Sequence, residues 1–368
     1  KILRIHPKDN LIVALSDLNK ADVVYLEDNE INLKTPVRAK HKFALENLNL
    51  GEHVYLYGVV VGRVIKKISK GEIITTQNIS HCTEEYHLPQ NLENKTWSTS
   101  KFDNYNSKSF LGYHRSDGKV GTENNWLVIP LVFCQNRNVE ELKKTLLSEL
   151  GYEKTRERVF DIDSLVKNFK AGATNKELLD EEILSSQKKY LKNPLFPNVD
   201  GIYFLTHEGG CGGAKSDSIS LCNLLAGYIN NPNVAGATVL SLGCQHAQIS
   251  ILEHSLKRIA PRLDKPVIFM EQQKSTSEPE YLAECIKKTF VGLIEANKIK
   301  REYAPLSKLI LGLECGGSDG FSGISANPVL GFVSDVIVSQ GGSAVLSEFP
   351  ELNGVEQELI NRCKTLKN

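Results

Sequence analysis

The stretch "GIYFLTHEGGCGGAKSDSISLCNLLAGYINNPNVAGATVLSLGC", residues 201–244, decides the fold because its pattern changes from strand to helix and back. The apolar runs at its two ends are nearly continuous, which is typical of strands buried on both faces of a sheet. Between them, residues 215–230 place apolar side chains at helical spacing. A strand, a helix and a strand in this order predict a right-handed crossover in a parallel sheet.

The same alternation extends over the second part of the chain. From about residue 110, the apolar runs of strand length are "NWLVIPLVFC", "GIYFLTH", "GATVLSLGC", "KPVIFME" and "SKLILGLEC". Helical patterns separate them near 139–150, 176–191, 215–230, 247–259, 278–297 and 328–340. In the last helix, Asn327 is the expected cap, Pro328 suits the first position, and Gly341 suits the end. We therefore predict an α/β domain with a mainly parallel sheet over residues 110–368.

The first part of the chain has a different character. Residues 1–82 contain short β-like runs divided by turn residues, which predicts a small all-β module. Residues 83–109 are polar, rich in Asn and Ser, and nearly free of aliphatic side chains. We interpret them as a linker between the module and the α/β domain.

Composition excludes several classes of function. The 368 residues include 44 basic and 44 acidic side chains, so no basic field favours nucleic acid or an anionic membrane as a partner. No apolar stretch reaches about 18 residues, the length of a membrane span. The eight cysteines are widely and irregularly spaced and form no CxxC motif. This spacing indicates reduced thiols in the cytoplasm rather than a disulfide framework.

Cysteine, histidine and glycine follow the predicted strands at the point where each one ends. The carboxyl ends of parallel strands line the ligand crevice of an open sheet, so side chains on these loops are expected to converge. The converging residues are Cys134, His207, Glu208, Cys211, Cys244, His246 and Cys315. Thiolate and imidazole together suit iron or zinc.

A phosphate site is the alternative for the glycine loop. Residues 209–216, "GGCGGAKS", approach the P-loop pattern GxxxxGK[ST], and a strand precedes them while a helix follows. Ala214 stands where the last glycine of that pattern belongs, and its Cβ would interfere with amides closing around phosphate. A nucleotide-binding enzyme therefore remains the weaker alternative.

Two further stretches are dense in small polar residues. In "GYHRSDGKVGTENNW", residues 112–126, Arg115 offers a two-pronged donor for a carboxylate, while Asn and Thr suit hydroxyl groups. A polar turn is the alternative for this stretch. The second stretch is "GLECGGSDGFSGISANP", residues 312–328. Together they predict a polyol or sugar-acid site formed by Arg115, Asp117, Thr122, Asn124, Ser318, Asp319, Ser322 and Asn327.

These motifs resemble a known family. "GxxRxDGxxGTxN", "HExGC", "LGC" and "CGGSDGFSGISANP" are similar to motifs of the UxaA-type sugar-acid dehydratases, the altronate and galactarate dehydratase family. "VRAKHKFAL" and "YGVVVGRVIKKISKGEIITTQNI" resemble the SAF module, a β-clip domain at the N-terminus of these enzymes. The resemblance implies loss of water from a sugar acid, altronate being the expected one, to give a 2-keto-3-deoxy acid. It also implies a homo-oligomer that depends on Fe²⁺ or Mn²⁺. A sugar-acid-binding relative without turnover is the alternative.

The chemistry of such a dehydration suggests candidate roles for individual residues. The metal ligands would be His41, Cys134, Cys211, Cys244 and Cys315. The acid and base would come from His207, Glu208 and His246, and the substrate carboxylate would meet Arg115 and Lys215. An iron–sulfur cluster on three of the cysteines is the alternative to a single metal ion.

The sequence departs from the family at two points. Glu123 in "GTEN" stands where the family has Arg, which puts one contact with substrate charge in doubt. The family also continues well beyond the equivalent of Asn368, so we expect the domain at 110–368 to lack its C-terminal part.

Overall fold

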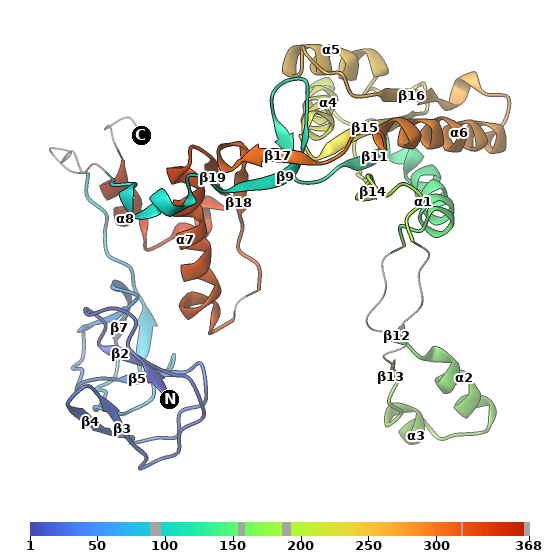
Figure 1. Cartoon of the computed structure of the whole chain (residues 1–368). Coiled ribbons are helices and arrows are strands. Elements are labelled where there is room, and N and C mark those ends of the chain that lie inside the picture. Colours follow the sequence, from blue (N-terminus) through green and yellow to red (C-terminus); the bar gives the residue numbers. More distant parts are fainter. Residues whose placement is uncertain (89–96, 154–158, 186–192, 318, 364–368) are drawn as a thin grey trace. The chain divides into compact units, whose positions relative to one another are not determined.

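The computed structural model describes residues 1–88, 97–153, 159–185, 193–317 and 319–363. The chain forms two compact units, one of Lys1–Lys108 with Pro305–Asn368 and one of Ser109–Ala304 (Figure 1). The domain expected over 110–368 therefore spans both units, and the division falls at Pro305. In the described residues, no helix is long and apolar enough to cross a membrane.

The second unit is built on a four-stranded parallel sheet. Its strand order is β14 (Gly201–Phe204), β11 (Asn125–Pro130), β15 (Val234–Ser241) and β16 (Val267–Glu271). Every neighbouring pair is parallel. All residues of the two central strands, β11 and β15, are buried, as their continuous apolar runs require. The predicted parallel sheet is confirmed.

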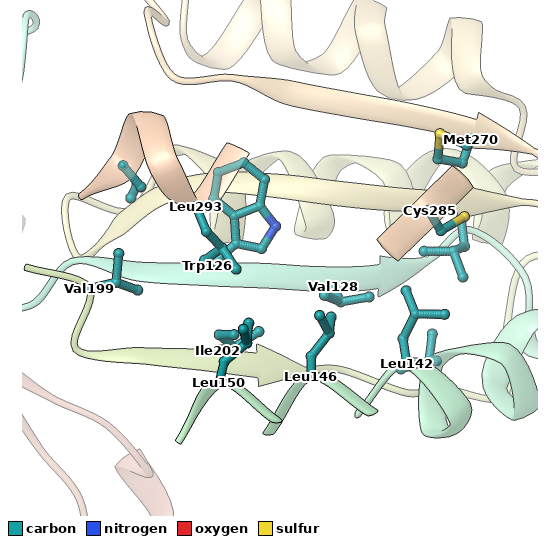
Figure 2. Close-up of a cluster of buried hydrophobic side chains, with 14 of the residues drawn as sticks. Trp126, Val128, Leu142, Leu146, Leu150, Val199, Ile202, Met270, Cys285 and Leu293 are labelled. Carbon is teal, nitrogen blue, oxygen red and sulfur yellow. The ribbon is translucent and has the colours of Figure 1, made fainter. Parts of the chain in front are cut away.

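Helices cover both faces of this sheet. Side chains alternate along β11, so Leu127 and Ile129 pack with α4 (Lys215–Asn230) and α5 (Ile249–Ile259). Trp126 and Val128 face the opposite side, where α1 (Asn136–Leu150) and α6 (Glu278–Ala296) supply the other half of the core (Figure 2). The sheet is thus the middle of three layers.

Trp126 organises the second of these cores. Its side chain is fully buried and its indole N–H donates to the Thr238 hydroxyl at 3.0 Å. A Cβ on Gly236 would lie 2.5 Å from the indole ring, and a Cβ on Gly292 would lie 2.1 Å from it. Glycine is therefore required on both sides, because a larger residue would occupy the space of the ring. Cys285 is buried in the same cluster.

Smaller elements complete the second unit. A separate sheet has three strands, in the order β10 (Val120–Gly121), β9 (Ser109–His114) and β17 (Glu302–Pro305). An excursion between β11 and β14 holds β12 (Val159–Phe160), α2 (Ile162–Lys170), α3 (Asn175–Leu179) and β13 (Leu184–Ser185). The helix predicted near 176–191 is limited to α3 in the described part, and 186–192 lie outside it.

In the first unit, residues 1–82 form the predicted all-β module. Its strands enclose two apolar clusters, one around Leu11 and Val54 and one around Ile12 and Phe43. The strands are β1 (Ile2–Leu3), β2 (Leu11–Ala14), β3 (Val23–Leu26), β4 (Asn29–Asn32), β5 (Lys42–Ala44), β6 (His53–Leu56), β7 (Val59–Val64) and β8 (Ile79–His81).

The expected linker at 83–109 contains structure of its own. Residues 89–96 lie outside the described part, but Ser100–Tyr105 form the 3₁₀ helix η1. Phe102 in this helix is buried, with its ring 5.8 Å from that of Phe332. This contact explains why η1 groups with the end of the chain in one compact unit.

The end of the chain forms a strand–helix–strand unit. β18 (Ile310–Leu313) and β19 (Ser343–Leu346) pair in parallel, with α7 (Ala326–Ser339) between them, and α8 (Glu356–Arg362) follows. The prediction that Asn327 caps α7 is wrong, because the helix begins at Ala326 and Asn327 lies inside its first turn. Gly341 follows the helix in the left-handed region at φ 86°, as predicted.

Candidate functional site

Three loops meet at the carboxyl edge of the four-stranded sheet. They follow β11, β14 and β15 and comprise residues 131–136, 205–214 and 242–248. Backbone bonds join them: the Phe133 N–H donates to the Gly209 carbonyl, and the Ala247 N–H donates to the Gly210 carbonyl, both at 3.0 Å. The three loops are therefore held against one another by the main chain, which fixes the positions from which their side chains project.

Gly210 lets the middle loop approach the end of β11. Its φ is +97°, and a Cβ there would lie 2.1 Å from the Leu131 carbonyl oxygen. Gly212 also has a positive φ, +77°, but no described atom lies within 4 Å of its ideal Cβ. Gly210 is thus required both for close packing and for its positive φ, whereas Gly212 is required only for its positive φ.

His207 anchors this loop. Its Nδ1 accepts from the Gly209 N–H at 3.1 Å, and its Nε2 lies 2.7 Å from the Pro130 carbonyl oxygen. Because Nδ1 accepts, the hydrogen-bond pattern assigns the ring proton to Nε2, which donates to Pro130. Both ring nitrogens are therefore engaged by the backbone. The sequence predicted acid–base work for His207, whereas the structure gives it a supporting position.

The groups that remain free to meet a ligand project from the same loops. Glu208, Cys134, Cys244 and His246 are exposed, and Cys211 is half-buried. Gln245, between Cys244 and His246, is buried and accepts from the Gly243 N–H at 2.7 Å. The sequence places Gln245 directly after a strand but assigns it no role. In the structure it holds the backbone from which its two neighbours project.

Lys215 begins α4, and its side chain is exposed. The Asp217 carboxylate accepts from the Ala214 N–H at 3.1 Å and so fills the amino end of this helix. A bound phosphate would need that position, and the negative charge of Asp217 would repel it. The geometry therefore disfavours the P-loop alternative.

The predicted metal ligands are divided between the two units. Cys134, Cys211 and Cys244 share the carboxyl edge of the sheet, whereas His41 and Cys315 belong to the first unit. Throughout the described ranges, no group of three or more His, Cys, Asp or Glu side chains is placed to hold a metal ion. The metal dependence that the sequence predicts therefore stays a prediction.

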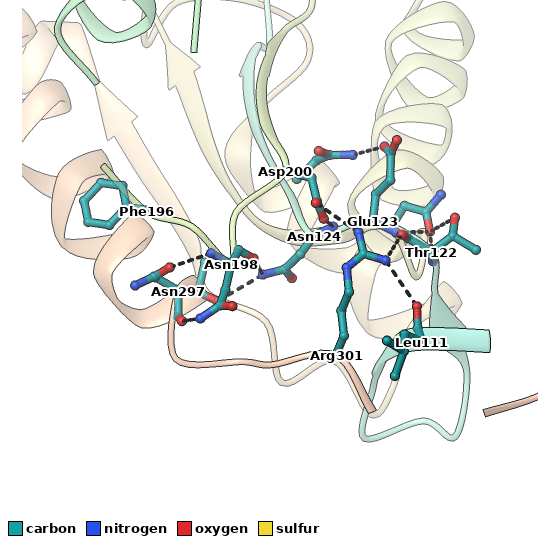
Figure 3. A network of polar contacts seen from close by, with 12 residues as sticks. Leu111, Thr122, Glu123, Asn124, Phe196, Asn198, Asp200, Asn297 and Arg301 are labelled. Atoms are coloured by element: carbon teal, nitrogen blue, oxygen red, sulfur yellow. Dashed lines mark hydrogen bonds and ion pairs between the residues drawn. The ribbon is translucent and has the colours of Figure 1, made fainter. Parts of the chain in front are cut away.

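Four predicted substrate contacts belong to the opposite, amino edge of the sheet, because they precede β11. Asn124 is fully buried, and its amide donates to the carbonyls of Asn198 at 2.8 Å and Ala296 at 3.0 Å (Figure 3). Its own carbonyl oxygen accepts from Arg115 at 2.9 Å. All the polar atoms of the Asn124 side chain are thus used inside the protein.

Arg115 is likewise engaged within the chain. Its side chain is 8% exposed and donates to the Pro232 carbonyl at 2.8 Å. Asp117 pairs with Lys119 at 2.8 Å, and the Thr122 N–H donates to the Asn233 side chain at 2.8 Å. Among the described residues, Arg115 Nη1 is buried and has no hydrogen-bond partner. The substrate contacts that the sequence predicts here stay predictions.

Further charged residues that the sequence analysis did not single out reinforce this edge. Arg301 pairs with Asp200 at 3.0 Å and donates to the Thr122 carbonyl at 2.8 Å. Lys265 donates to the Asn231 carbonyl at 2.6 Å. Burial, and then the nearby charge of Arg115, lowers the pKa of Lys265 to about 7.

Glu123, the departure from the family pattern, lies at the same edge. Its carboxylate accepts from the Asn125 amide at 2.6 Å. This bond lies at the amino edge of the sheet, away from the loops at the carboxyl ends of the strands.

The remaining predicted residues belong to the first unit. Asp319 pairs with Lys40 at 2.6 Å, and this bond, with one from the Phe321 N–H, holds the pKa of the Asp319 carboxyl below its ordinary value. The Ser322 hydroxyl donates to the Asp319 carbonyl at 2.7 Å. His41, Cys315 and Asn327 are exposed, and Ser318 lies outside the described residues.

Comparison with known proteins covers the chain from end to end. Residues 1–82 match the altronate/galactarate dehydratase SAF domain. Residues 112–297 match the family described as D-galactarate dehydratase/altronate hydrolase, second domain, and residues 306–368 match D-galactarate/altronate dehydratase, C-terminal.

Curated relatives match over nearly the whole chain. Altronate dehydratase of Bacillus subtilis (strain 168) is 31% identical over 98% of this chain and 62% of the relative. Altronate dehydratase of Escherichia coli (strain K12) is 28% identical over 98% of this chain and 63% of the relative. Galactarate dehydratase (L-threo-forming) of the same strain is 24% identical over 98% and 61%. This chain spans about three fifths of the length of these relatives.

Proposed function

The chain belongs to the D-galactarate dehydratase/altronate hydrolase family, and on that premise we propose that it removes water from a sugar acid. The expected substrate is altronate, and the expected product is a 2-keto-3-deoxy acid. Two curated relatives named altronate dehydratase, matching along 98% of the chain, support this choice of substrate.

The observation on which the proposal rests is the construction of the carboxyl edge. Main-chain bonds hold three loops together there, and Glu208, His246 and Cys244 project from them into solvent. Acid–base chemistry needs groups that are accessible to substrate and fixed in position. This edge meets both requirements, whereas the amino edge is closed by its own hydrogen bonds.

The reaction assigns two roles to these groups. One side chain takes the proton from C2 of the sugar acid, and another gives a proton to the C3 hydroxyl as it leaves as water. Glu208 and His246 are the candidates, because the ring nitrogens of His207 are already bonded to the backbone. The enol that results converts to the keto acid without further help.

Lys215 is the proposed contact for the substrate carboxylate. It lies at the start of α4, seven residues after Glu208 in the same loop-to-helix connection, and its ammonium group is exposed. Arg115 is left out of this assignment, because its guanidinium group is buried at the other edge of the sheet.

Dependence on Fe²⁺ or Mn²⁺ is a further part of the proposal. A bound metal would stabilise the negative charge that develops when the C2 proton leaves. The thiols of Cys134, Cys211 and Cys244 are donors of a kind that iron accepts. Because the described residues hold no three-ligand cluster, every step above is assigned to the protein's own groups.

We also propose a cytoplasmic homo-oligomer whose ligand is a small sugar acid, with neither nucleic acid nor membrane as a partner. All eight cysteines are free, which agrees with a reducing compartment. The balanced charge of 44 basic and 44 acidic residues gives no electrostatic reason for a polyanionic partner.

An anaerobic assay tests the proposal. Purified protein is mixed with a panel of sugar acids, with and without Fe²⁺ or Mn²⁺, and 2-keto-3-deoxy acid is measured. We expect Glu208→Gln and His246→Asn to lower turnover by about 100-fold or more, the usual contribution of an acid or base. His254→Gln, an exposed histidine on α5, is the matched control and keeps full activity.

The outcomes separate the alternatives. Equal turnover in the Glu208, His246 and His254 variants would contradict the assignment of the acid and base. Tight binding of one sugar acid without any product would indicate a binding protein instead of an enzyme. Nucleotide binding with no response to sugar acids would favour the P-loop alternative.

A further inference from the structure

The four-stranded sheet of the second unit ends at a strand that has one neighbour. In the described ranges, β16 pairs with β15 alone, in parallel, and so forms one edge of the sheet. Its sequence is VIFME, in which only the last side chain is charged. Proteins commonly protect an open edge with charged residues, whereas an apolar edge is a template for another strand.

Alternate residues of β16 turn their backbone groups toward this open edge. The Pro266 carbonyl accepts from the Ala237 N–H at 3.0 Å, so Pro266 turns its backbone toward β15. In a strand, the backbone groups of every second residue point to the same side. The N–H and C=O groups of Val267, Phe269 and Glu271 therefore point outward, where a further strand would bond to them.

The side chains beside this edge leave a hollow on each face of the sheet. On the face that α5 covers, Leu256, Val267 and Phe269 are among the residues that line a hollow of about 560 Å³. On the face that α6 covers, Ile268 and Val291 help to line one of about 380 Å³. Val291 is 60% exposed. The edge therefore leaves apolar surface uncovered on both faces.

The charged side chains around the two hollows suit a second copy of the same surface. On α6, Lys287 and Glu295 lie four residues before and four residues after Val291. A two-fold axis beside Val291 brings Lys287 of each copy to Glu295 of the other. At the other hollow, Glu253 and Lys257 of α5 are one helical turn apart and likewise carry opposite charges. The surface is thus complementary to itself in charge.

The dimensions of the sheet agree with such an axis. Neighbouring strands lie about 4.8 Å apart, and α6 packs over β15 and β16. An axis halfway between β16 and its copy therefore passes about 5 Å from α6, which places the two α6 helices about 10 Å apart. Packed helices lie about 8 to 10 Å apart, so the two α6 helices come within packing distance.

We propose that β16 pairs with β16 of a second copy of this chain, antiparallel and centred on Phe269, so that two four-stranded sheets join into one. In this register Phe269 lies opposite its own copy and Val267 opposite Glu271, which uses every outward backbone group of the strand. The exposed side chains of Val291 from the two copies meet on one face. The proposal rests on the homo-oligomer proposed above, but it does not depend on the proposed reaction.

Sedimentation equilibrium of the full chain tests the surface. We expect a dimer, and we expect Val291→Glu to raise its dissociation constant about 100-fold, because two carboxylates then face each other at the axis. Leu224→Glu, at a 58% exposed apolar residue of α4, is the matched control and leaves the dissociation constant unchanged. A monomeric unaltered chain, or a dimer that Val291→Glu does not weaken, would overturn the proposal.

Charge exchange tests the two-fold arrangement. Lys287→Glu and Glu295→Lys each place two pairs of like charges across the axis, and we expect each change to raise the dissociation constant about ten-fold. The double variant should restore the original value. An equimolar mixture of the two single variants should form mixed dimers, because opposite charges then meet at both contacts. Failure of both rescues would overturn the arrangement.

Amide exchange identifies the strand. We expect exchange at Val267, Phe269 and Glu271 to slow about ten-fold as the protein concentration rises through the dissociation constant. Exchange at Ile268 and Met270, which bond to β15, should be slow at every concentration. Slow exchange at all five amides in dilute protein would mean that the same chain covers the edge, which would overturn the proposal. These measurements need no sugar acid, so a failure of the proposed reaction leaves them interpretable.

Discussion

The two edges of the four-stranded sheet use the same kinds of residue for opposite purposes. At the amino edge, Asn124 and Arg115 are buried and bonded to one another and to main-chain carbonyls. At the carboxyl edge, the half-buried His207 and the buried Gln245 bond to the backbone, and Glu208 is exposed to solvent. At the amino edge these residues bond within the protein, whereas at the carboxyl edge they hold a backbone from which reactive side chains project.

This difference shows that a polar residue's position before or after its strand indicates its role better than its residue type does. Arg115 and Asn124 precede β11, so the direction of the chain places them away from the loops that follow the strands. In a parallel sheet all carboxyl ends share one edge, and polar residues that precede the strands belong to the other. The predictions below test this division.

The largest expected effect is at the carboxyl edge, where backbone packing and site coincide. We expect Gly210→Ala to lower the free energy of unfolding by about 3 to 5 kcal/mol, because its Cβ meets the Leu131 carbonyl at a positive φ. Gly212→Ala, which meets the same φ penalty without a described neighbour, costs about 1 kcal/mol. Urea unfolding of both variants measures the difference, and equal losses would contradict the close packing.

The next effect is at the amino edge. Asn124→Ala removes the partners of two carbonyls and of Arg115, so we expect a loss of about 3 kcal/mol at roughly 1 kcal/mol for each. Thr122→Ala, whose exposed hydroxyl lies 3.4 Å from Asn233, is the control and changes stability by less than about 0.5 kcal/mol. If Asn124→Ala were as stable as the unaltered chain but no longer bound the sugar acid, the amino edge would belong to the substrate site.

Replacing Cys244, an exposed thiol at the carboxyl edge, is expected to lower turnover and leave stability nearly unchanged. Cys244→Ser should leave the free energy of unfolding within about 0.5 kcal/mol, because the side chain is exposed. Turnover should fall about 100-fold if Cys244 is a metal ligand or supports one. Cys82→Ser, in the N-terminal module, is the control that keeps activity. Full activity of Cys244→Ser would remove this thiol from the proposal.

The last prediction is a dependence of stability on pH at the amino edge. The folded pKa of Lys265, about 7, lies below the ordinary value of 10.5, so above pH 7 the unfolded chain retains a proton that the native chain has released. Stability attributable to this residue therefore rises with pH between 7 and 10, with a slope of at most about 1.4 kcal/mol per pH unit. Unfolding midpoints should show this slope in the unaltered chain, and Lys265→Met should lack it. Lys257→Met, an exposed lysine on α5, retains it.

The elements of the fold were predictable because continuous apolar runs and helical spacing report burial directly. β11 and β15, for example, are buried along their whole length, as their composition indicates. The grouping of residues 305–368 with the N-terminal module was not predictable, because it depends on contacts such as Lys40 with Asp319, between residues far apart in sequence. The start of α7 was missed since Asn327 has the type of a cap but follows the first helical residue.

The site was predictable in part. The loops after β11, β14 and β15 were found because glycine, cysteine and histidine follow apolar runs. The role of His207 was not, since it depends on which groups meet the two ring nitrogens, and no local pattern reports that. Gln245 gave no signal because an anchoring glutamine has the same sequence context as an exposed one.

The burial of Trp126 has a practical consequence for spectroscopy. The chain has two tryptophans, and the units contain one each: Trp97 in the first, 46% exposed, and Trp126 in the second, fully buried. Iodide in solution should quench the emission of Trp97 and spare that of Trp126, whose indole lies within the core. Trp97→Phe would then leave a chain whose fluorescence follows the second unit alone, and Trp126→Phe one that follows the first. Intrinsic fluorescence can thus report on each of the two units separately.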